Sequence, residues 1–374
     1  MRKLGPGGFS ILGAKAAPRV TVVMPVCNAA RFVREAVASV LAQTYCDFEL
    51  IVVDDLSSDE SLSILQCFDD ARIRIIGHET NKGAAVSRNE ALAAARGELV
   101  AIMDADDVCV PTRLERQMAF LDANPRVGLV GCGIYDNIDA ENVVLHTSYL
   151  PECNEAIQRD LMERWCFLHS SIMFRRSLYE TVGGYASAFE PAEDYDFVLR
   201  ILEHCEAHNL YERLVSYRLN PKGLSVRSRQ YINQVNSAAI RLAKRRRAGQ
   251  PEDREAEISR ISELKRTGGT RSGLVGVMHT LRDSFGAANR YYGFGCLEFC
   301  AGRLKTARRC FIFSVRTNSL FVKSWIVIGL TLMPSVANRL KVFFRSSMLQ
   351  QNAVKLVTPP VTETHPVVNQ TLIS

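Results

Sequence analysis

The stretch Glu98-Leu-Val-Ala-Ile-Met-Asp-Ala-Asp-Asp107 decides the fold, because an apolar run leads directly into three carboxylates. A short apolar run with a polar end is typical of a buried strand. Three carboxylates within four residues repel one another, and a divalent cation that also binds phosphate oxygens is the usual way to offset this repulsion. The alternative is an acid-rich start to the helix that Pro111 opens.

Strands and helices alternate around this stretch. Apolar, β-branched runs predict strands at 20–24, 49–53, 72–76 and 98–103. Apolar residues at helical spacing predict helices at about 32–41, 59–68, 82–95 and 111–122. Their short connections predict an α/β fold with a mostly parallel, Rossmann-like sheet flanked by helices. Ligands of such sheets bind beyond the carboxyl ends of the strands, where three polar clusters stand: 25–28, 54–55 and 104–107.

The chain after residue 126 is less regular. Strands are expected at 127–135 and 168–174, a turn at Gly183-Gly184 and a helix over 194–206. We interpret this part as a second half packed on the first sheet. The predicted organisation is an N-terminal extension 1–18, a nucleotide-binding half 19–125, an acceptor half 126–228, a charged linker or solvated helix 229–274, a basic amphipathic helical segment 275–346 and a disordered tail 347–374.

The positive charge of the protein is confined to its C-terminal part. The net charge is +6, yet residues 299–362 hold ten Lys or Arg and no acid, which leaves −4 for the rest of the chain. Such a segment favours an anionic membrane surface, and it lacks the interleaved base-stacking aromatic residues of a nucleic-acid binder. We expect the uncharged run 324–338, too short to span a bilayer, to lie in the membrane interface, or alternatively to pack on the protein's own body.

The N-terminus and the cysteines indicate the compartment. Residues 1–18 carry Gly5, Pro6, Gly7 and Gly8 where a secretory signal would have its apolar run. The eleven cysteines include no Cys-x-x-Cys pair, so we interpret them as thiols in a reducing compartment. We therefore expect a cytoplasmic protein that is peripherally associated with the inner face of the cell membrane.

Five short motifs, taken together, resemble the family 2 glycosyltransferases with the GT-A fold. They are Pro25-Val-Cys-Asn28, Asp54-Asp55, Lys82-Gly83 followed by Arg88, the acidic run 104–107 and Glu193-Asp194. The resemblance covers about residues 19–226, and the order and spacing of the motifs make the set specific although each motif alone is weak. Cys27 departs from the family, whose members usually carry Tyr or Phe at this position.

The resemblance implies a nucleotide-sugar site at the ends of the strands. The segment 25–28 would wrap the nucleotide, and Asp55, or Asp54 beside it, would accept the ring N–H of uracil. Arg88 would lie near the base or the diphosphate, unless it is a surface arginine of a helix. The donor site that the resemblance implies consists of Pro25, Val26, Asn28, Asp54, Asp55, Lys82, Arg88, Asp104, Gly184, Glu193 and Arg218.

The resemblance also implies the chemistry. Asp106, together with Asp104 beside the ribose, would bind Mn²⁺ or Mg²⁺, and Asp107 would cap the following helix. Asp194 would be the general base that deprotonates the acceptor hydroxyl, which then attacks the anomeric carbon opposite the leaving nucleotide and inverts its configuration. His169 would either face this site or be a satisfied core histidine.

Transfer of a single sugar is expected, because the motif of processive relatives is absent. These carry Gln-x-x-Arg-Trp after the base, whereas the only Arg-Trp here, Arg164-Trp165, precedes Asp194. We expect a UDP-sugar donor and a lipid-linked or membrane-proximal glycan acceptor in cell-envelope or exopolysaccharide biosynthesis. Two alternatives stay open. One is a catalytically silent, membrane-attached component that binds a nucleotide sugar, and the other is a nucleotidyltransferase, which would need a Gly-rich basic loop at residues 25–28.

Overall fold

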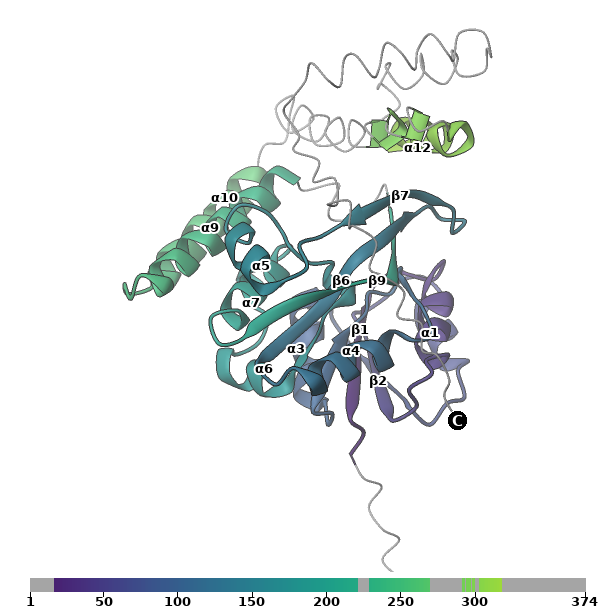
Figure 1. Ribbon diagram of the computed structural model, residues 1–374, viewed down its shortest axis with the longest axis horizontal. Coiled ribbons are helices and arrows are strands. Elements are labelled where there is room, and N and C mark those ends of the chain that lie inside the picture. Colours follow the sequence, from purple (N-terminus) through teal and green to yellow (C-terminus); the bar gives the residue numbers. More distant parts are fainter. Residues whose placement is uncertain are drawn as a thin grey trace, which may run out of the picture.

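A nine-stranded sheet forms the centre of the computed structural model, which describes residues 17–220, 229–269, 291–292, 294–296, 298–299 and 303–317 (Figure 1). The strands are β1 Val20–Val26, β2 Phe48–Asp54, β3 Ile73–Gly77, β4 Leu99–Ile102, β5 Val108–Cys109, β6 Val127–Ile138, β7 Val144–Tyr149, β8 Met173–Arg175 and β9 Glu206–Arg218. Their order in the sheet is β3-β2-β1-β4-β8-β6-β9-β5, and β7 pairs with β6. Nearly all of the predicted extension, most of the basic segment 275–346 and the tail 347–374 lie outside the described residues.

Helices cover both faces of the sheet. They are α1 Val33–Leu41, α2 Ser61–Gln66, α3 Ala84–Ala94, α4 Arg113–Ala123, α5 Asn154–Asp160, α6 Arg176–Val182, α7 Glu193–Ile201, α9 Arg229–Arg247, α10 Arg254–Gly269 and α12 Leu304–Thr317, with single 3-10 turns η1 His169–Ser171 and η2 Ser187–Phe189. The apolar core on one face includes α1, α2 and α4, and the core on the other includes α3, α6 and α7. The predicted helix–sheet–helix layering is confirmed.

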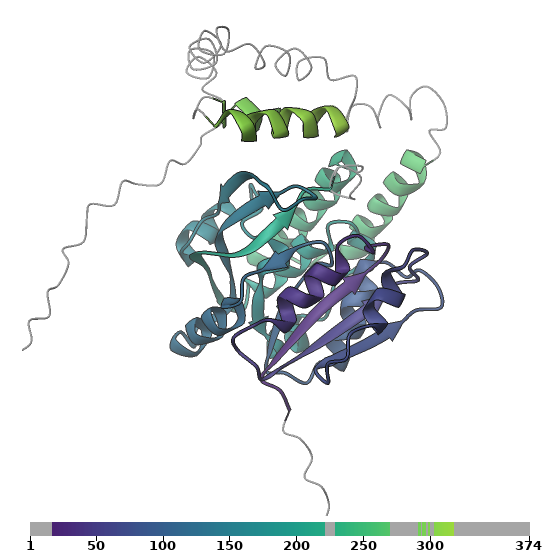
Figure 2. The same ribbon diagram turned by 90° about the vertical axis from the view of Figure 1, so that its right-hand side faces the viewer.

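The first half of the chain, residues 19–125, has the predicted topology. β1 pairs in parallel with β2 and β4, and β2 with β3, so that Val26 lies beside Asp54 at the end of the strands. Figure 2 shows α1 against one face of this part of the sheet. Both faces of β2 are buried, with Ile51 and Val53 in one core and Val52 in the other. Because parallel strands end at the same edge, the polar residues that follow β1, β2 and β4 meet there.

The second half extends the same sheet and is not an independent domain. The short strand β8 lies between β4 and β6 and is antiparallel to both. β9 pairs in parallel with β6, and β7 is antiparallel to β6. The end of β9 pairs with β5, which directly follows Asp107, so the chain returns to the acidic run.

Two predictions for the second half are right only in part, because the strand is limited to β8 and the helix to α7. The apolar run 168–174 forms the 3-10 turn η1 before β8, because the hydroxyls of Ser170 and Ser171 turn inward, one to Asp107 and the other to the N–H of Cys132. The helix predicted over 194–206 ends earlier, since α7 stops at residue 201 and β9 begins at residue 206. β9 owes its structure to pairing with β6, a long-range contact that hydrophobic spacing does not reveal.

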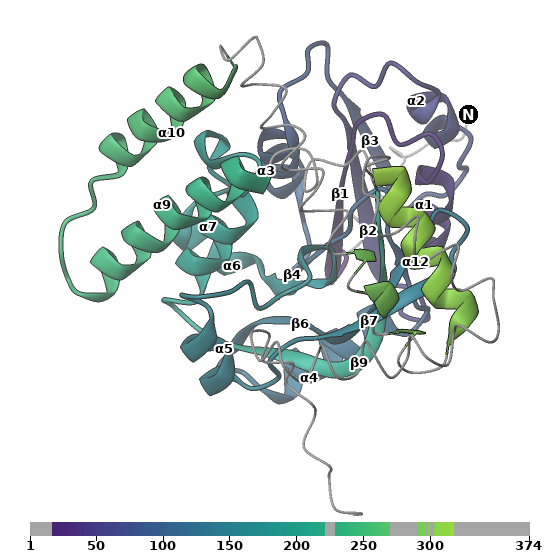
Figure 3. The same ribbon diagram turned by 90° about the horizontal axis from the view of Figure 1, so that it is seen from above.

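The charged segment after residue 228, for which a linker or a solvated helix is predicted, forms two helices, and these pack on the protein as a hairpin. α9 lies beside α7, and α10 lies beside α9 (Figure 3). Val235 and Leu242 of α9 and Ile261 of α10 are buried in the same core as α7. Arg254 of α10 donates to the Asp196 carboxylate of α7 at 3.3 Å. The hairpin therefore covers the helix that carries Glu193 and Asp194.

The helix α12 packs on β7. Its Cys310 and Phe313 share a small apolar core with Leu145 of β7, and its Arg309 Nη1 donates to an Asp139 carboxylate oxygen at 3.0 Å. Within the described part of the chain, no helix combines the length and the apolar character needed to cross a bilayer. The run 324–338, for which we predict an interfacial helix, lies outside that part.

Candidate active site

The loops that follow β1 and β2 are bonded together and form one side of the candidate site. Asn28, whose φ of 53° lies in the left-handed region that Asn tolerates, accepts the N–H and the hydroxyl of Ser58 on Oδ1 at 2.8 and 3.0 Å. Its own N–H donates to Ser57 Oγ at 3.0 Å. Pro25 and Val26 end β1 immediately before this loop. The predicted segment 25–28 is thus held against the residues that follow Asp54-Asp55.

Asp54 and Asp55 are both buried where β2 ends. Asp55 Oδ1 accepts the N–H of Lys82 at 2.7 Å, and Oδ2 accepts the N–H of Gly83 at 2.8 Å. Burial raises the pKa of Asp55, but a hydrogen bond from His78 and the two backbone N–H groups outweigh it and lower the pKa overall. Asp54 Oδ1 is buried without a partner among the described residues. Lys82 contributes its backbone N–H, while its side chain is 43% exposed.

Arg88, buried on α3, joins the acidic run to the Glu193-Asp194 pair. Its Nη1 donates to Glu193 Oε1 at 2.6 Å, and its Nη2 donates to Asp104 Oδ1 at 3.0 Å. Burial lowers the pKa of Arg88, but the carboxylates of Asp104 and Glu193 outweigh it, so the guanidinium stays charged. Arg88 Nε and Glu193 Oε2 are buried without a partner in the part of the chain that is described. The alternative of a surface arginine is wrong.

The acidic run brings two partly exposed carboxylates, Asp104 and Asp106, close enough to affect each other. Burial, together with the charge of Asp104, raises the pKa of Asp106 to about 6. Burial also raises the pKa of Asp104, but the nearby Arg88 outweighs it and lowers the pKa overall. A cation would relieve the repulsion that raises the pKa of Asp106, so this pair fits a divalent metal.

A metal at this place would take only part of its ligands from the protein. Among the described residues no three His, Cys, Asp or Glu side chains form a cluster that could hold a metal ion. Mg²⁺ commonly binds through one or two carboxylates and completes its shell with phosphate oxygens and water. Asp106 and Asp104 are therefore the residues that would hold Mn²⁺ or Mg²⁺ together with a diphosphate.

Asp107 does not cap the following helix, and that prediction is wrong. Its carboxylate is fully buried, where Oδ1 accepts the N–H of Arg218 at 2.8 Å and Oδ2 accepts the hydroxyl of Ser170. Thr112 precedes α4, and no side chain caps that helix. Burial, and after it the neighbouring carboxylates, raise the pKa of Asp107 well above its usual range. Asp107 fastens the acidic run to β9 and η1.

Arg218 ends β9, and each of the three nitrogens of its buried guanidinium donates a hydrogen bond within the protein. Nε donates to the carbonyl oxygen of Asp106 at 2.7 Å, Nη1 to the carbonyl of Asp139 at 2.8 Å and Nη2 to Glu35 Oε2 at 2.8 Å. The guanidinium also lies 4.6 Å from the centre of the Phe32 ring. Because the side chain is only 1% exposed, a contact with the donor diphosphate would require it to move. In the structure Arg218 holds the backbone of the acidic run in place.

Glu193 and Asp194 are the first two residues of α7. Asp194 is partly exposed, and its Oδ1 accepts the N–H of Tyr195 at 2.8 Å. Burial, followed by the charge of Glu193, raises the pKa of Asp194 to about 7, against the lowering effect of Arg88. A carboxylate with a pKa near neutrality matches the requirement for a general base better than an ordinary Asp does.

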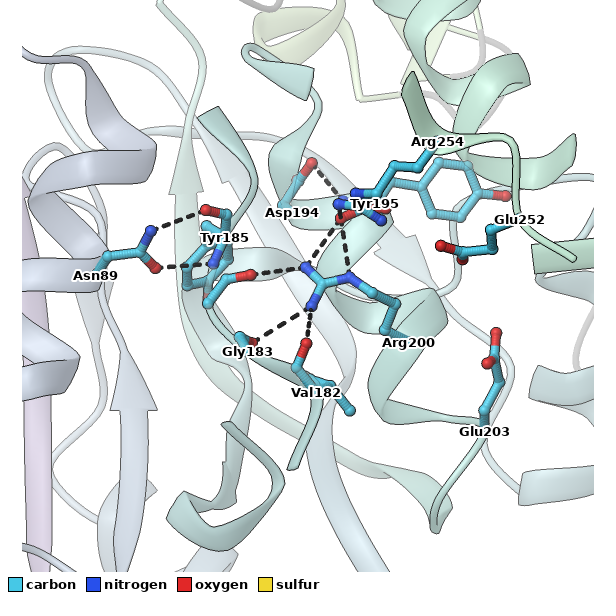
Figure 4. Close-up of polar contacts among 12 residues, drawn as sticks. Asn89, Val182, Gly183, Tyr185, Asp194, Tyr195, Arg200, Glu203, Glu252 and Arg254 are labelled. Carbon is cyan, nitrogen blue, oxygen red and sulfur yellow. Dashed lines mark hydrogen bonds and ion pairs between the residues drawn. The ribbon is translucent and has the colours of Figure 1, made fainter. Parts of the chain in front are cut away.

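The turn before α7 is held against α3 by Asn89. Asn89 Nδ2 donates to the carbonyl of Tyr185 at 2.8 Å, and the N–H of Tyr185 donates to Asn89 Oδ1 at 2.7 Å (Figure 4). A Cβ on Gly184 would lie 2.2 Å from Asn89 Oδ1, so this close approach requires glycine. On α7, Arg200 donates to the carbonyl groups of Val182 and Gly184, each at 2.7 Å. Gly184 thus sets how closely the turn approaches α3.

His169 is a core histidine, the second of the two alternatives. Its Nε2 lies 3.1 Å from the Tyr185 hydroxyl. Burial, and then the positive charge of Arg88, lower the pKa of His169 to about 3. Its imidazole is therefore neutral near pH 7.

The sequence motifs do not indicate two residues that build this end of the sheet, Glu190 and Ser170. Glu190 Oε1 accepts the N–H of Ala84 at 2.7 Å, and Glu190 lies against Gly83, whose φ is 90°. Ser170 donates to Asp107. These hydrogen bonds join residues 106 and 63 positions apart, so no local spacing could have revealed them.

Comparisons with known proteins agree with this geometry. The family model described as Glycosyl transferase family 2 matches residues 21–183. The chain is 33% identical over 232 residues to the putative glycosyltransferase EpsE of Bacillus subtilis (strain 168), which covers 60% of this chain and 80% of that protein. A second relative is the UDP-Glc:alpha-D-GlcNAc-diphosphoundecaprenol beta-1,3-glucosyltransferase WfgD of Escherichia coli. The two are 40% identical over 105 residues, which make up 28% of this chain and 42% of WfgD.

A solved structure supports the fold. The crystal structure of S. aureus TarS 1-349 in complex with UDP has a TM-score of 0.50 to this chain, with 18% sequence identity, and covers 83% of this chain and 90% of that one. At this identity the similarity concerns the fold alone. With the family match and the similarity to most of EpsE, it leads to one conclusion: the chain is a GT-A glycosyltransferase that belongs to family 2.

Proposed function

We propose that this glycosyltransferase transfers a single sugar, with inversion, from a UDP-sugar to a lipid-linked glycan acceptor of cell-envelope or exopolysaccharide biosynthesis. The observation that carries the proposal is the connection from Asp194 to the acidic run. Asp194, the candidate base, adjoins Glu193, which Arg88 joins to Asp104. Asp194, the candidate proton acceptor, and the acidic run, which would bind the diphosphate, are thereby fixed relative to each other. A displacement at a sugar carbon requires such a fixed arrangement.

Asp194 would act on the acceptor. Its carboxylate takes the proton of the acceptor hydroxyl while that oxygen attacks the anomeric carbon from the face opposite the nucleotide. The C–O bond to the diphosphate breaks with its electron pair going to the leaving phosphate oxygen. Burial, and after it the neighbouring Glu193 whose Oε1 is bonded to Arg88, raise the pKa of Asp194 to about 7.

The acidic run would act on the leaving group. Asp106 and Asp104 would hold Mn²⁺ or Mg²⁺, whose chemistry is to offset the negative charge that grows on the diphosphate. Arg218 Nε donates to the carbonyl oxygen of Asp106, and the buried carboxylate of Asp107 accepts the N–H of Arg218. These two hydrogen bonds keep the acidic run in one position. Loss of these hydrogen bonds would displace Asp106 without removing either of the carboxylates that would hold the metal.

The donor and acceptor classes come from a relative. WfgD is named for a UDP-glucose donor and a diphosphoundecaprenol-linked acceptor, and the matched region is 40% identical. A lipid-linked acceptor also agrees with the basic C-terminal segment, for which we propose a peripheral position on the inner face of the cell membrane. Transfer of one sugar rests on the missing Gln-x-x-Arg-Trp motif.

Metal-dependent binding of UDP tests this function. Saturating UDP with Mn²⁺ should raise the melting temperature, because a ligand at 100 times its Kd stabilises the native state by about 2.7 kcal/mol. Asp106→Asn should remove the Mn²⁺-dependent part of this rise, whereas Asp122→Asn, a surface carboxylate on α4 that pairs with Arg19, should keep it. Thermal unfolding with UDP, GDP and TDP provides the measurement.

The outcomes of that experiment separate the competing functions. Equal behaviour of the two variants, or no stabilisation by any of the three nucleotides, would refute the proposal. Binding without release of sugar from a panel of UDP-sugars would favour the silent binding component.

The rate of transfer should increase with pH between 6 and 8. Asp194 must be ionised to accept a proton, and a pKa of about 7 leaves it about 9% ionised at pH 6 and about 91% at pH 8. We therefore expect kcat/KM to rise about tenfold over this range. Initial rates measured at constant ionic strength check this, with melting temperatures at each pH as the control for unfolding. A flat profile would contradict the assignment of Asp194 as the titrating base.

A further inference from the structure

His78, which directly follows β3, is a buried imidazole beside the proposed base-binding carboxylate. Its side chain is 1% exposed. Nδ1 lies 2.7 Å from Asp55 Oδ1, and Nε2 lies 2.8 Å from Glu90 Oε2 on α3. None of the sequence motifs includes His78, and the transfer mechanism does not use it.

The imidazole of His78 lies between two carboxylates, to which it can only donate. A neutral imidazole has one donor and one acceptor nitrogen, whereas an ionised carboxylate can only accept. A hydrogen on Nδ1 is therefore donated to Asp55, and a hydrogen on Nε2 is donated to Glu90. The hydrogen bond from His78 is the main cause of the lowered pKa of Glu90. For Asp55, burial raises the pKa, and the hydrogen bond from His78 is the largest of the effects that lower it. The other charged group here is Lys82, whose Nζ lies 3.6 Å from Glu90.

Among the described residues, the bonds to Asp55 leave it one free acceptor position. Each carboxylate oxygen has two lone pairs. Those of Oδ1 are taken by His78 and by the N–H of Lys82, and one of those on Oδ2 is taken by the N–H of Gly83. The remaining lone pair on Oδ2 is the position from which Asp55 can accept a further N–H.

We infer that His78 is a positioning residue for the donor nucleotide: it holds the Asp55 carboxylate so that the free position on Oδ2 meets the ring N–H of the base, and Glu90 anchors the far side of the imidazole. This inference rests on the proposed function, which makes Asp55 the acceptor of the base N–H. Without His78, the carboxylate keeps its two backbone bonds but gains freedom to rotate, and Oδ1 becomes a competing acceptor.

A double-mutant cycle on UDP affinity tests the inference. The Kd of UDP in the presence of Mn²⁺ is measured by calorimetry for the wild type, His78→Ala, Asp55→Asn and the double variant. We expect His78→Ala to weaken binding roughly tenfold, which corresponds to about 1.4 kcal/mol. Because His78 acts through Asp55, the double variant should bind UDP no more weakly than Asp55→Asn alone.

Two further variants separate positioning from general stability. His78→Gln keeps one donor toward Asp55 and should bind UDP more tightly than His78→Ala, and it keeps the test possible if the alanine variant does not fold. His208→Gln removes a histidine of β9 whose ring stacks on Phe120 at 4.5 Å. His208 is remote from the loops that follow β1 and β2, so this variant should leave UDP affinity unchanged.

The contrary outcomes are distinct. Additive losses in the double variant, or unchanged UDP affinity in His78→Ala, would overturn the role of His78 while leaving the proposed function intact. If the wild type binds neither UDP, GDP nor TDP, the proposed function fails first and the inference falls with it.

Discussion

Replacing Asp194 by asparagine is expected to lower sugar transfer by about 10²–10⁴-fold, the range that a general base contributes. The amide has nearly the same shape, and its oxygen can still accept the N–H of Tyr195 as Asp194 Oδ1 does. It cannot take a proton from the acceptor hydroxyl. The variant should therefore fold normally and lose activity in kcat.

Two measurements make this prediction specific. The Kd of UDP with Mn²⁺ should stay within about twofold of the wild type, because a base acts on the acceptor and contributes little to donor binding. Asp122→Asn, which removes a surface carboxylate of α4, serves as the matched control and should retain full activity. Loss of UDP binding in Asp194→Asn would instead place Asp194 in the donor site.

Arg88→Met is expected to destabilise the protein by about 3–5 kcal/mol, the cost of leaving buried charges without their partner. Arg88 is 9% exposed and is bonded to Glu193 and Asp104, so the variant leaves two carboxylates facing each other in the space that the guanidinium fills. Removal of the cation should also raise the pKa of Asp194 further, since Arg88 lowers it in the wild type. Urea unfolding measures the first effect and the pH profile of transfer the second.

A surface arginine gives the comparison. Arg116→Met removes an arginine that is paired with Glu212 but 56% exposed, and its unfolding midpoint should not change measurably. Arg88→Lys keeps the positive charge, but its ammonium group cannot reach both carboxylates as the planar guanidinium does. Its stability should lie between those of Arg88→Met and Arg116→Met. Equal stability of Arg88→Met and Arg116→Met would show that the buried connection contributes nothing.

The first half of the fold could be predicted from the sequence because its signals are local. Each strand there is a short β-branched run, each helix has its own apolar spacing, and each connection is short. The parallel pairing then brings the polar strand ends, among them Asp55 and Asp104, to one edge without further information. The outline of the site follows from topology alone.

The second half could not be predicted to the same extent, because distant residues determine it. Ser170 and Ser171 break the predicted strand 168–174 to reach Asp107 and Cys132, and nothing in the run itself reveals these partners. The predicted role of Asp107 is wrong for the same reason. Its position before a proline suggests a cap, but its actual partner, Arg218, is 111 residues away.

The three-residue strand β8 has a consequence for the order in which the protein is made. Among the described strands, β8 alone lies between β4 and β6, and its residues 173–175 pair with residues 99–101 of β4. A chain growing on the ribosome can therefore form the parallel strands β1 to β4 early, but cannot join the later strands to them until β8 has emerged. Until then β4 has an open edge, a surface prone to pairing with other chains. We expect this late closure, and not the early parallel sheet, to be the step most dependent on chaperones.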